Sequence, residues 1–409
     1  MRIGISGGTF DPVHKGHIES ALAAKEKLKL DQVVFVPGGE PPHKLDRRIT
    51  AGEDRLAMLH MALAPFEGLT VSEYELSKEG YSYSIDTVKH LAQAYGEEAE
   101  LFYIIGADIV GELEHWKDCR ELFELCRFAV FMRPGYDSAK FLRDVEYSRQ
   151  LGAEIFPVEG PAVDISSERI RRAVRQGQTE AIAAFLPEGV RAYIGEKQLY
   201  VREPAFDEAF AVRNMKIRLA PERFRHSLQV AQEAMRIGTQ FGIDPEKCRL
   251  AGLLHDCGKG VTEHQLHWLE PSLIELGKPE KGGNPAIVHG PAGAIIARRK
   301  YGIIDSEILE AIRCHVTGSP DMGPVAQAVF IADYTEPGRV GASFQKVRRI
   351  LKEAEPRLRG LYGPVVSACD ENIKYVLAKG EVLNPLVLET RNRFLMMKEE
   401  TDEFQRNGR

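Results

Sequence analysis

The stretch GGTFDPVHKGH, from Gly7 to His17, decides how the first part of the chain folds. It follows the short β-rich run RIGIS and precedes a segment with helical spacing at residues 18–30. Glycines after a strand let backbone N–H groups approach a phosphate, and the start of a helix adds a positive dipole there. Because His14 and His17 are three residues apart, both imidazoles share one helical face and can reach one phosphate. The stretch predicts a phosphate-binding turn; the alternative is a glycine turn with two surface histidines.

The alternation of strand-like and helical segments continues to about residue 200. The β-rich runs are QVVFVPGG, LTVSEYEL, LFYIIGAD and RFAVFMRPG, and a helical stretch covers residues 85–95. Strands that alternate with helices indicate a parallel sheet covered on both faces. Glycine and proline clusters come just after the strands, where such sheets place their ligand crevice. We therefore expect an α/β domain over residues 1–200 with its site at that edge of the sheet.

Strand signals disappear in the second half of the chain. Pro221 suits the first turn of a helix. The apolar residues that follow it at spacings of three and four predict one buried face, made of Phe224, Leu228, Ala231 and Met235. We expect an all-α bundle over residues 216–385, preceded by a linker at 201–215 and followed by a polar tail at 386–409.

The composition narrows the classes of protein. A length of 409 residues suggests two domains, and 44% hydrophobic with 28% charged residues is ordinary for a globular chain. No apolar run approaches the roughly 18 residues that cross a bilayer, and the N-terminus lacks an apolar signal core. The net charge of −6 disfavours a nucleic-acid binder. Because the six cysteines include no CxxC pair, we expect free thiols in a reducing cytosol. Together, these features predict a cytoplasmic protein without membrane or nucleic-acid partners.

Histidines and aspartates recur on the separate helical segments of the second half. Mixed imidazole and carboxylate ligands suit iron, manganese or zinc. Asp333 lies in the apolar run VFIADY, where a carboxylate is costly unless a cation or hydrogen bonds compensate it. A capped or salt-bridged core aspartate is the alternative for that residue. The pattern predicts a dinuclear metal site with the ligands His226, His255, Asp256, His289, His315 and Asp333.

The motifs of the first half resemble those of a known family. The opening stretch resembles the signature of the HxGH nucleotidyltransferases, and PGGEPPHK, YSIDTV, IIGADIVGELEHW and DISSERIR resemble motifs of bacterial nicotinate-mononucleotide adenylyltransferases, in the same order. Glu168 departs from the family pattern, which has Thr there. The resemblance implies a Rossmann-like nucleotidyltransferase domain that uses ATP and nicotinate mononucleotide with Mg²⁺ and forms deamido-NAD and pyrophosphate. Another adenylyl- or cytidylyltransferase, or a catalytically inactive nucleotide-binding module, is the alternative.

The same resemblance implies the roles of individual residues. It implies that the negative charge developing on the phosphates during transfer is stabilised by His14, His17, Lys44 and Arg171. It also implies that the pyridine ring stacks on Trp116. From the residues alone, core packing is the alternative for Trp116, and an ordinary helix cap is the alternative for Ser166 and Ser167. The implied nucleotide- and substrate-binding residues are Gly7, Gly8, Thr9, Phe10, His43, Ser84, Asp86, Thr87, Gly106, Asp108, Trp116, Arg133, Ser166 and Ser167.

The second half resembles the HD-domain metal-dependent phosphohydrolases, and in particular their YqeK-like branch. The matching stretches are RHSLQVAQEA, AGLLHDCGK, EAIRCHVTG and IADYTEPGR. The resemblance implies an all-α HD-domain bundle that hydrolyses dinucleoside polyphosphates, cutting diadenosine tetraphosphate symmetrically into two ADP. His289 and His315 would complete the second metal position, and Lys259 would neutralise developing charge. A phosphatase or sensor for another nucleotide is the alternative, and the sequence leaves the oligomeric state open, a homo-oligomer included.

Overall fold

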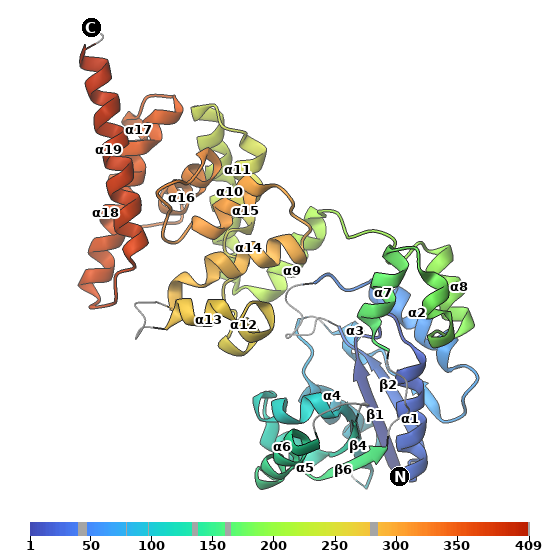
Figure 1. Ribbon diagram of the computed structural model, residues 1–409. Helices are drawn as coiled ribbons and strands as arrows, with labels where there is room; N and C mark the ends of the chain where they lie inside the picture. Colours follow the sequence, from blue (N-terminus) through green and yellow to red (C-terminus); the bar gives the residue numbers. More distant parts are fainter. Residues whose placement is uncertain are drawn as a thin grey trace. The chain divides into compact units, whose positions relative to one another are not determined.

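The computed structural model describes residues 1–39, 47–78, 80–96, 98–132, 138–159, 165–278 and 285–407. The chain divides into two compact units: the first ends at Glu203 and the second begins at Pro204, except that Arg47 and Arg48 group with the second unit. Strands and helices alternate in the first unit, whereas the described part of the second unit is helical (Figure 1). The expected order of an α/β domain followed by an all-α domain is therefore confirmed.

A parallel sheet with the strand order β3-β2-β1-β4-β5-β6 forms the centre of the first unit. The strand order reverses between β1 and β4, and sheets of this kind place their ligand crevice outside the carboxyl ends of the strands at such a reversal. β6 is the strand that the sequence reading missed, since IFPVE is short and contains a proline. The strands are β1 (Arg2–Gly8), β2 (Gln32–Pro37), β3 (Leu69–Val71), β4 (Glu100–Gly106), β5 (Arg127–Met132) and β6 (Ile155–Glu159).

Helices cover both faces of this sheet, so the first unit has two apolar cores. Along β2, Val33 and Phe35 enter one core, while Val34 and Val36 enter the other. This follows from the twofold alternation of side chains along a strand. The helices are α1 (Lys15–Lys27), α2 (Gly52–Leu63), α3 (Tyr74–Ser77), α4 (Ser84–Tyr95), α5 (Cys119–Leu125), α6 (Ser138–Gln150), α7 (Ser167–Arg175) and α8 (Glu188–Glu196), with the 3₁₀ helices η1 (Ala107–His115) and η2 (Thr179–Phe185).

The second unit packs its helices around α16, which is buried along most of its length, from Val325 to Ala332. A helix that is apolar all round belongs at the centre of a bundle. The helices are α9 (Glu208–Arg218), α10 (Pro221–Phe241), α11 (Pro245–Leu254), α12 (Glu263–Leu269), α13 (Ser272–Gly277), α14 (His289–Arg299), α15 (Ser306–Cys314), α16 (Pro324–Thr335), α17 (Ala342–Glu353), α18 (Tyr362–Ala378) and α19 (Pro385–Asn407), with the 3₁₀ helices η4 (Pro285–Ile287) and η5 (Leu358–Leu361).

The buried face of α10 differs from the expected one. Leu228 and Met235 are each 39% exposed, whereas His226, Val230 and Ala234 are buried. The face that packs inward carries a histidine and a serine, and a reading based on apolar residues alone does not count these. The predicted face is therefore correct in part: Ala231 is buried and Phe224 packs against the core, whereas Leu228 and Met235 are exposed.

The segments expected to be a linker and a polar tail both contain helix. α9 occupies most of the expected linker, and Ala211 and Met215 are buried in the helical core. α19 covers the described part of the expected polar tail, where Val387, Thr390 and Phe394 are at most 3% exposed. In both cases a narrow apolar stripe at helical spacing lies within a segment whose average composition is polar.

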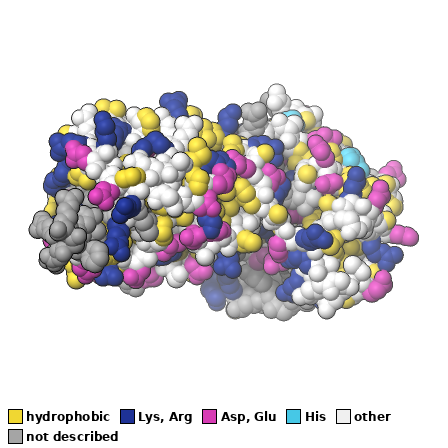
Figure 2. Space-filling model, turned by 90° about the horizontal axis from the view of Figure 1, so that it is seen from above, with side chains coloured by type: hydrophobic (Ala, Val, Ile, Leu, Met, Phe, Trp, Pro, Cys, Tyr) yellow, Lys and Arg dark blue, Asp and Glu magenta, His cyan; other side chains and the backbone are white. Residues whose placement is uncertain are grey.

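The surface and the thiols agree with the composition. Acidic and basic side chains are intermingled over the visible face in Figure 2, as the near balance of 54 basic and 60 acidic residues leads one to expect. All six cysteines are free, as expected. Among the described residues, no helix is both long enough and apolar enough to cross a membrane.

Candidate functional site

The GGTFDPVHKGH stretch forms the turn from β1 into α1, at the crevice edge of the sheet. His14 caps α1, and its backbone N–H donates to Nδ1 of His17 over 3.2 Å. The two imidazole rings stack with their centroids 3.7 Å apart. Phe10 is buried and meets the ring of His17 edge-on at 5.0 Å, so it acts as a packing support for the histidine pair. The structure thus brings the two histidines together at the start of a helix.

Contacts from distant parts of the first unit hold this turn. Arg171 donates to the carbonyl oxygen of Asp11 over 2.6 Å, and Ser167 donates to that of Pro12 over 2.9 Å. The buried carboxylate of Asp11 accepts from the Tyr200 hydroxyl over 2.8 Å and from the backbone N–H of Thr50 over 3.4 Å. Sequence reasoning missed Asp11 and Tyr200, because nothing near either residue indicates a partner so far along the chain.

The remaining predicted residues of the opening and closing motifs have structural contacts. A Cβ at Gly7 would collide with the Tyr103 hydroxyl, so only glycine fits there. A Cβ at Gly8 would lie against the ring of Phe10, 3.2 Å from its nearest atom. The carbonyl of Thr9 accepts from Arg55 over 2.8 Å. Ser166 caps α7 by accepting from the backbone N–H of Arg169, as the helix-cap alternative expected.

The expected pyridine-binding residues meet around the buried Tyr103. Ser84, the first residue of α4, donates to the Tyr103 hydroxyl over 3.2 Å. Trp116 is partly buried and packs edge-on against the Tyr103 ring at 5.6 Å. Asp86, in the first turn of α4, pairs with Lys78. A single aromatic side chain therefore connects Trp116 to the start of α4.

Glu75 is a buried acid that the sequence reading overlooked. It is 8% exposed and accepts from the Thr87 hydroxyl over 2.5 Å. A Cβ at Gly39 would collide with the carbonyl oxygen of Glu75, so the turn after β2 presses directly on this residue. Burial raises the pKa of Glu75, and hydrogen bonds from Thr87 and Gly39 offset part of that shift. Glu75 thus joins the turn after β2 to the first turn of α4.

The other predicted residues of the first unit fall into two groups. Gly106 ends β4 and Asp108 is exposed just beyond it, at the crevice edge. His43, Lys44 and Arg133 lie outside the described residues.

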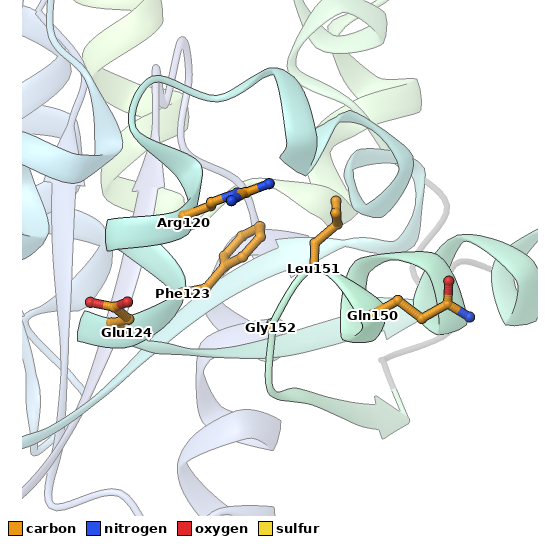
Figure 3. Close-up of a pocket in the computed structure, with 6 residues that line it drawn as sticks. All are labelled: Arg120, Phe123, Glu124, Gln150, Leu151 and Gly152. Carbon is orange, nitrogen blue, oxygen red and sulfur yellow. The ribbon is translucent and has the colours of Figure 1, made fainter.

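Figure 3 shows a pocket in the first unit. Its residues belong to α5, to the end of α6 and to the turn after α6, directly before β5 and β6 begin. It therefore opens at the amino ends of these strands, opposite the histidine pair, and we assign it no role in the site. The residues that line it are Arg120, Phe123, Glu124, Gln150, Leu151 and Gly152.

Ends and inner faces of several helices form a second site in the helical unit. His226 lies on the buried face of α10 and Asp333 in the last turn of α16. α11 ends at Leu254, so His255 and Asp256 follow a helix end, which is one of the two arrangements expected for adjacent ligands. His289 begins α14 and His315 directly follows α15. The structure brings all six predicted residues together.

The six residues form two overlapping groups that share His255. In each group the potential ligand atoms lie within 4.8 Å of one another: His226, His255 and Asp333 in one, and His255, Asp256 and His315 in the other. His289 Nε2 adjoins the second group, 3.2 Å from Asp256 Oδ1 and 3.0 Å from His315 Nε2. Nitrogen and carboxylate ligands in two adjacent groups fit two metal ions.

The state of the histidine rings supports this fit. His255 and His315 each bond through Nδ1 to the carbonyl oxygen three residues earlier, over 2.7 and 2.8 Å. A carbonyl only accepts, so Nδ1 carries the proton and Nε2 keeps a lone pair. Nε2 of His255 is buried without a hydrogen-bond partner among the described residues, and the buried Nε2 of His226 faces Asp333 Oδ1 at 3.0 Å. Burial lowers the pKa of His255 to about 4, which keeps its ring neutral, as metal binding requires.

Three cationic side chains accompany the carboxylates. Arg223 lies 3.1 Å from Asp256 Oδ2, and Arg339 lies 2.5 Å from Asp333 Oδ1. Burial opposes ionisation of both aspartates, but the neighbouring histidines, and Arg339 at Asp333, outweigh it and hold both pKa values well below the usual range. Burial lowers the pKa of Lys259, which interacts with Asp256. Sequence reasoning named Lys259 but missed both arginines.

Comparison with known proteins assigns the two units to different families. Residues 5–173 match the cytidylyltransferase-like family, and residues 223–338 match the HD domain. Among solved structures, a predicted HD superfamily hydrolase involved in NAD metabolism from Clostridium acetobutylicum is 29% identical, with a TM-score of 0.41, covering 47% of this chain and 99% of that one. A Plasmodium falciparum nicotinic acid mononucleotide adenylyltransferase is 16% identical, with a TM-score of 0.41, covering 49% and 97%.

Curated relatives align with the first half along nearly their whole length. A probable nicotinate-nucleotide adenylyltransferase from Thermoanaerobacter sp. is 41% identical over 204 residues, covering 50% of this chain and 96% of the relative. Another, from Moorella thermoacetica, is 42% identical over 204 residues, covering 49% and 91%. Through its first half the chain therefore belongs to the nicotinate-nucleotide adenylyltransferase family, and its second half is an HD domain.

Proposed function

We propose that the first unit transfers AMP from ATP to nicotinate mononucleotide and releases pyrophosphate. The observation that carries this proposal is the stacked pair of His14 and His17 at the start of α1, with Arg171 bonded to the same turn. Identity above 40% to adenylyltransferases over nearly their full length supports the same assignment. The product is deamido-NAD.

The proposed reaction needs charge stabilisation more than a catalytic base. A phosphate oxygen of nicotinate mononucleotide forms a bond to the α-phosphorus of ATP, and the bond from that phosphorus to the bridging oxygen breaks. The leaving pyrophosphate keeps the electron pair. Imidazole N–H groups, the Arg171 guanidinium and backbone N–H groups at the start of α1 would hold the negative charge that develops on the phosphoryl oxygens. ATP would enter as its Mg²⁺ complex.

We further propose that nicotinate mononucleotide is preferred over its nicotinamide counterpart. Trp116 and Ser84 both contact Tyr103, so a pyridine ring stacked on Trp116 would place its substituent close to the start of α4. Free backbone N–H groups at a helix start favour a carboxylate over a neutral amide.

Steady-state kinetics with the two mononucleotides test both statements. A charge-assisted hydrogen bond contributes about 1.5–3 kcal/mol, so kcat/KM for the nicotinate form should be higher by about tenfold or more. Equal specificity constants would remove the carboxylate preference. Failure to form either dinucleotide from ATP would remove the adenylyltransferase assignment.

For the second unit we propose a metal-dependent phosphohydrolase of dinucleoside polyphosphates. The observation that carries this proposal is the pair of overlapping histidine–aspartate groups. Iron, manganese or zinc bound there would supply Lewis-acid activation of water and phosphate. Arg223, Arg339 and Lys259 lie beside the carboxylates and would bind the polyphosphate chain.

The finer proposal is symmetrical cleavage of diadenosine tetraphosphate. Water oxygen would bond to one of the two central phosphorus atoms, the central P–O–P bridge would break, and both products would be ADP. Chromatography of the products distinguishes this outcome from AMP plus ATP. Hydrolysis of another nucleotide without any cleavage of diadenosine tetraphosphate would favour the alternative, a phosphatase of different specificity.

A further inference from the structure

Glu336 is a buried carboxylate that the proposed metal centre does not yet use. It directly follows α16 and lies three residues after Asp333, in the stretch IADYTEPGR. Its side chain is 2% exposed. Oε1 lies 3.1 Å from Nδ1 of His226, and Oε2 accepts from the backbone N–H of Gly338. Both carboxylate oxygens therefore have defined partners.

The position of His226 explains why it needs a side-chain partner. His255 and His315 follow helix ends, where the carbonyls of the last turn lack partners within the helix, and each ring bonds to one of them. His226 lies inside α10, where the carbonyl groups below it accept from backbone N–H groups of the same helix. Only a group from another element can fix its Nδ1, and Glu336 supplies one.

We propose that Glu336 is a positioning residue that holds His226 as a metal ligand. An accepting carboxylate keeps the proton on Nδ1, so Nε2 retains its lone pair, and that atom lies 3.0 Å from Asp333 Oδ1. A carboxylate bonded to a ligating histidine fixes the tautomer and ring orientation and increases the basicity of the ligand. This inference rests on the metal centre proposed above and concerns one of its ligands.

Neighbouring contacts keep Glu336 in place. Arg348, on α17, donates to the carbonyl oxygens of Thr335, Glu336 and Arg339, and so clamps the turn that follows α16. Arg339, at the end of that turn, donates through Nε to the backbone carbonyl of Asp333 over 2.9 Å. The short turn TEPGR thus contacts two of the proposed ligands: Glu336 bonds to His226, and Arg339 bonds to Asp333.

Titration of the full-length chain with Co²⁺ alone, followed by visible absorption, tests this role. Glu336→Gln keeps the shape of the side chain and removes its charge, and it should weaken Co²⁺ binding about 10- to 100-fold and change the spectrum. Glu353→Gln makes the same chemical change at an exposed position on α17 and should bind like wild type. The thermal midpoint of each metal-free protein shows whether the fold is retained.

A second pair of variants separates positioning from a structural role. In a His226→Ala background the ring is absent, so adding Glu336→Gln should leave Co²⁺ affinity unchanged. A further loss in that background would mean that Glu336 acts on the fold, and would overturn the proposal. Wild-type affinity in Glu336→Gln would overturn it as well and leave the metal centre standing. A wild-type chain that binds no Co²⁺ would instead refute the metal centre itself.

Discussion

The two units build their sites in opposite ways. In the first unit a sheet edge presents a turn, and the histidine pair is held by its own backbone and by contacts from α7 and Tyr200. In the second unit helix ends and one buried helix face present side chains, and backbone carbonyls or Glu336 fix one ring nitrogen of each of three histidines. We propose that the first arrangement binds the phosphates of a substrate and that the second binds metal ions.

The two sites also differ in the partners of their aspartates, which are arginines in the second unit and neutral donors in the first. The aspartates of the helical site each lie beside an arginine, since buried carboxylates need compensation. In the first unit the buried Asp11 accepts from Tyr200 and Thr50 and supports the turn. Burial and the nearby Asp11 raise the pKa of Tyr200, so its hydroxyl remains a donor. We therefore expect a substitution in one site to impair the reaction of its own unit and to leave the other reaction unchanged, with effects of different size in the two units.

The largest effect is expected at Asp256, whose carboxylate lies beside three histidines and Arg223. Asp256→Ala should release metal and abolish hydrolysis, because it removes a ligand atom from the second group. Elemental analysis and a hydrolysis assay check this, with the exposed Asp321→Ala as control. Wild-type metal content together with wild-type hydrolysis would contradict the assignment.

The free energy of unfolding should show that α19 packs into the helical core and is not a frayed tail. Phe394 is 1% exposed in the helical core, so Phe394→Ala should lower the free energy of unfolding of the second unit by about 3–5 kcal/mol. Leu388→Ala, at a position 45% exposed on the same helix, should cost at most about 0.5 kcal/mol. Urea unfolding measures both. Equal effects would mean that α19 does not contribute to the core.

His17→Ala should reduce the turnover of adenylyl transfer roughly 100-fold, as loss of one transition-state contact does. His60, exposed on α2, provides the matched control His60→Ala. Single-turnover kinetics at saturating substrate separate chemistry from binding. Turnover close to that of wild type would remove the histidine pair from the mechanism.

The smallest effect concerns Glu75, whose pKa is raised in the folded protein chiefly by burial. When the folded pKa is the higher one, the stability contribution of the group is complete below its usual pKa of 4.5 and is lost as the pH rises through the folded value. Wild type should therefore lose stability relative to Glu75→Gln as the pH rises from about 4.5, the usual pKa of the group, towards neutral. Urea unfolding of both proteins across this range measures the difference; a constant or opposite trend would exclude the shift.

Much of both sites could be predicted because their residues belong to short motifs. Spacing alone indicates the pairing of His14 with His17 and a helix end near His255. Contacts between distant segments could not be predicted, such as Arg171 with Asp11, 160 residues apart. Glu336 lies within a recognised stretch, yet its partner His226 is 110 residues away, so only the fold reveals its role. The buried face of α10 was predicted only in part, because it includes the polar residue His226, which apolar spacing does not count.

We propose that each unit carries a separate chemistry. The most direct measurement assays the full-length His17→Ala and Asp256→Ala proteins, alone and mixed, for both adenylyl transfer and diadenosine tetraphosphate hydrolysis. Each variant should lose one reaction and keep the other at the wild-type rate, and the mixture should recover both. Loss of both reactions in either single variant would contradict the claim.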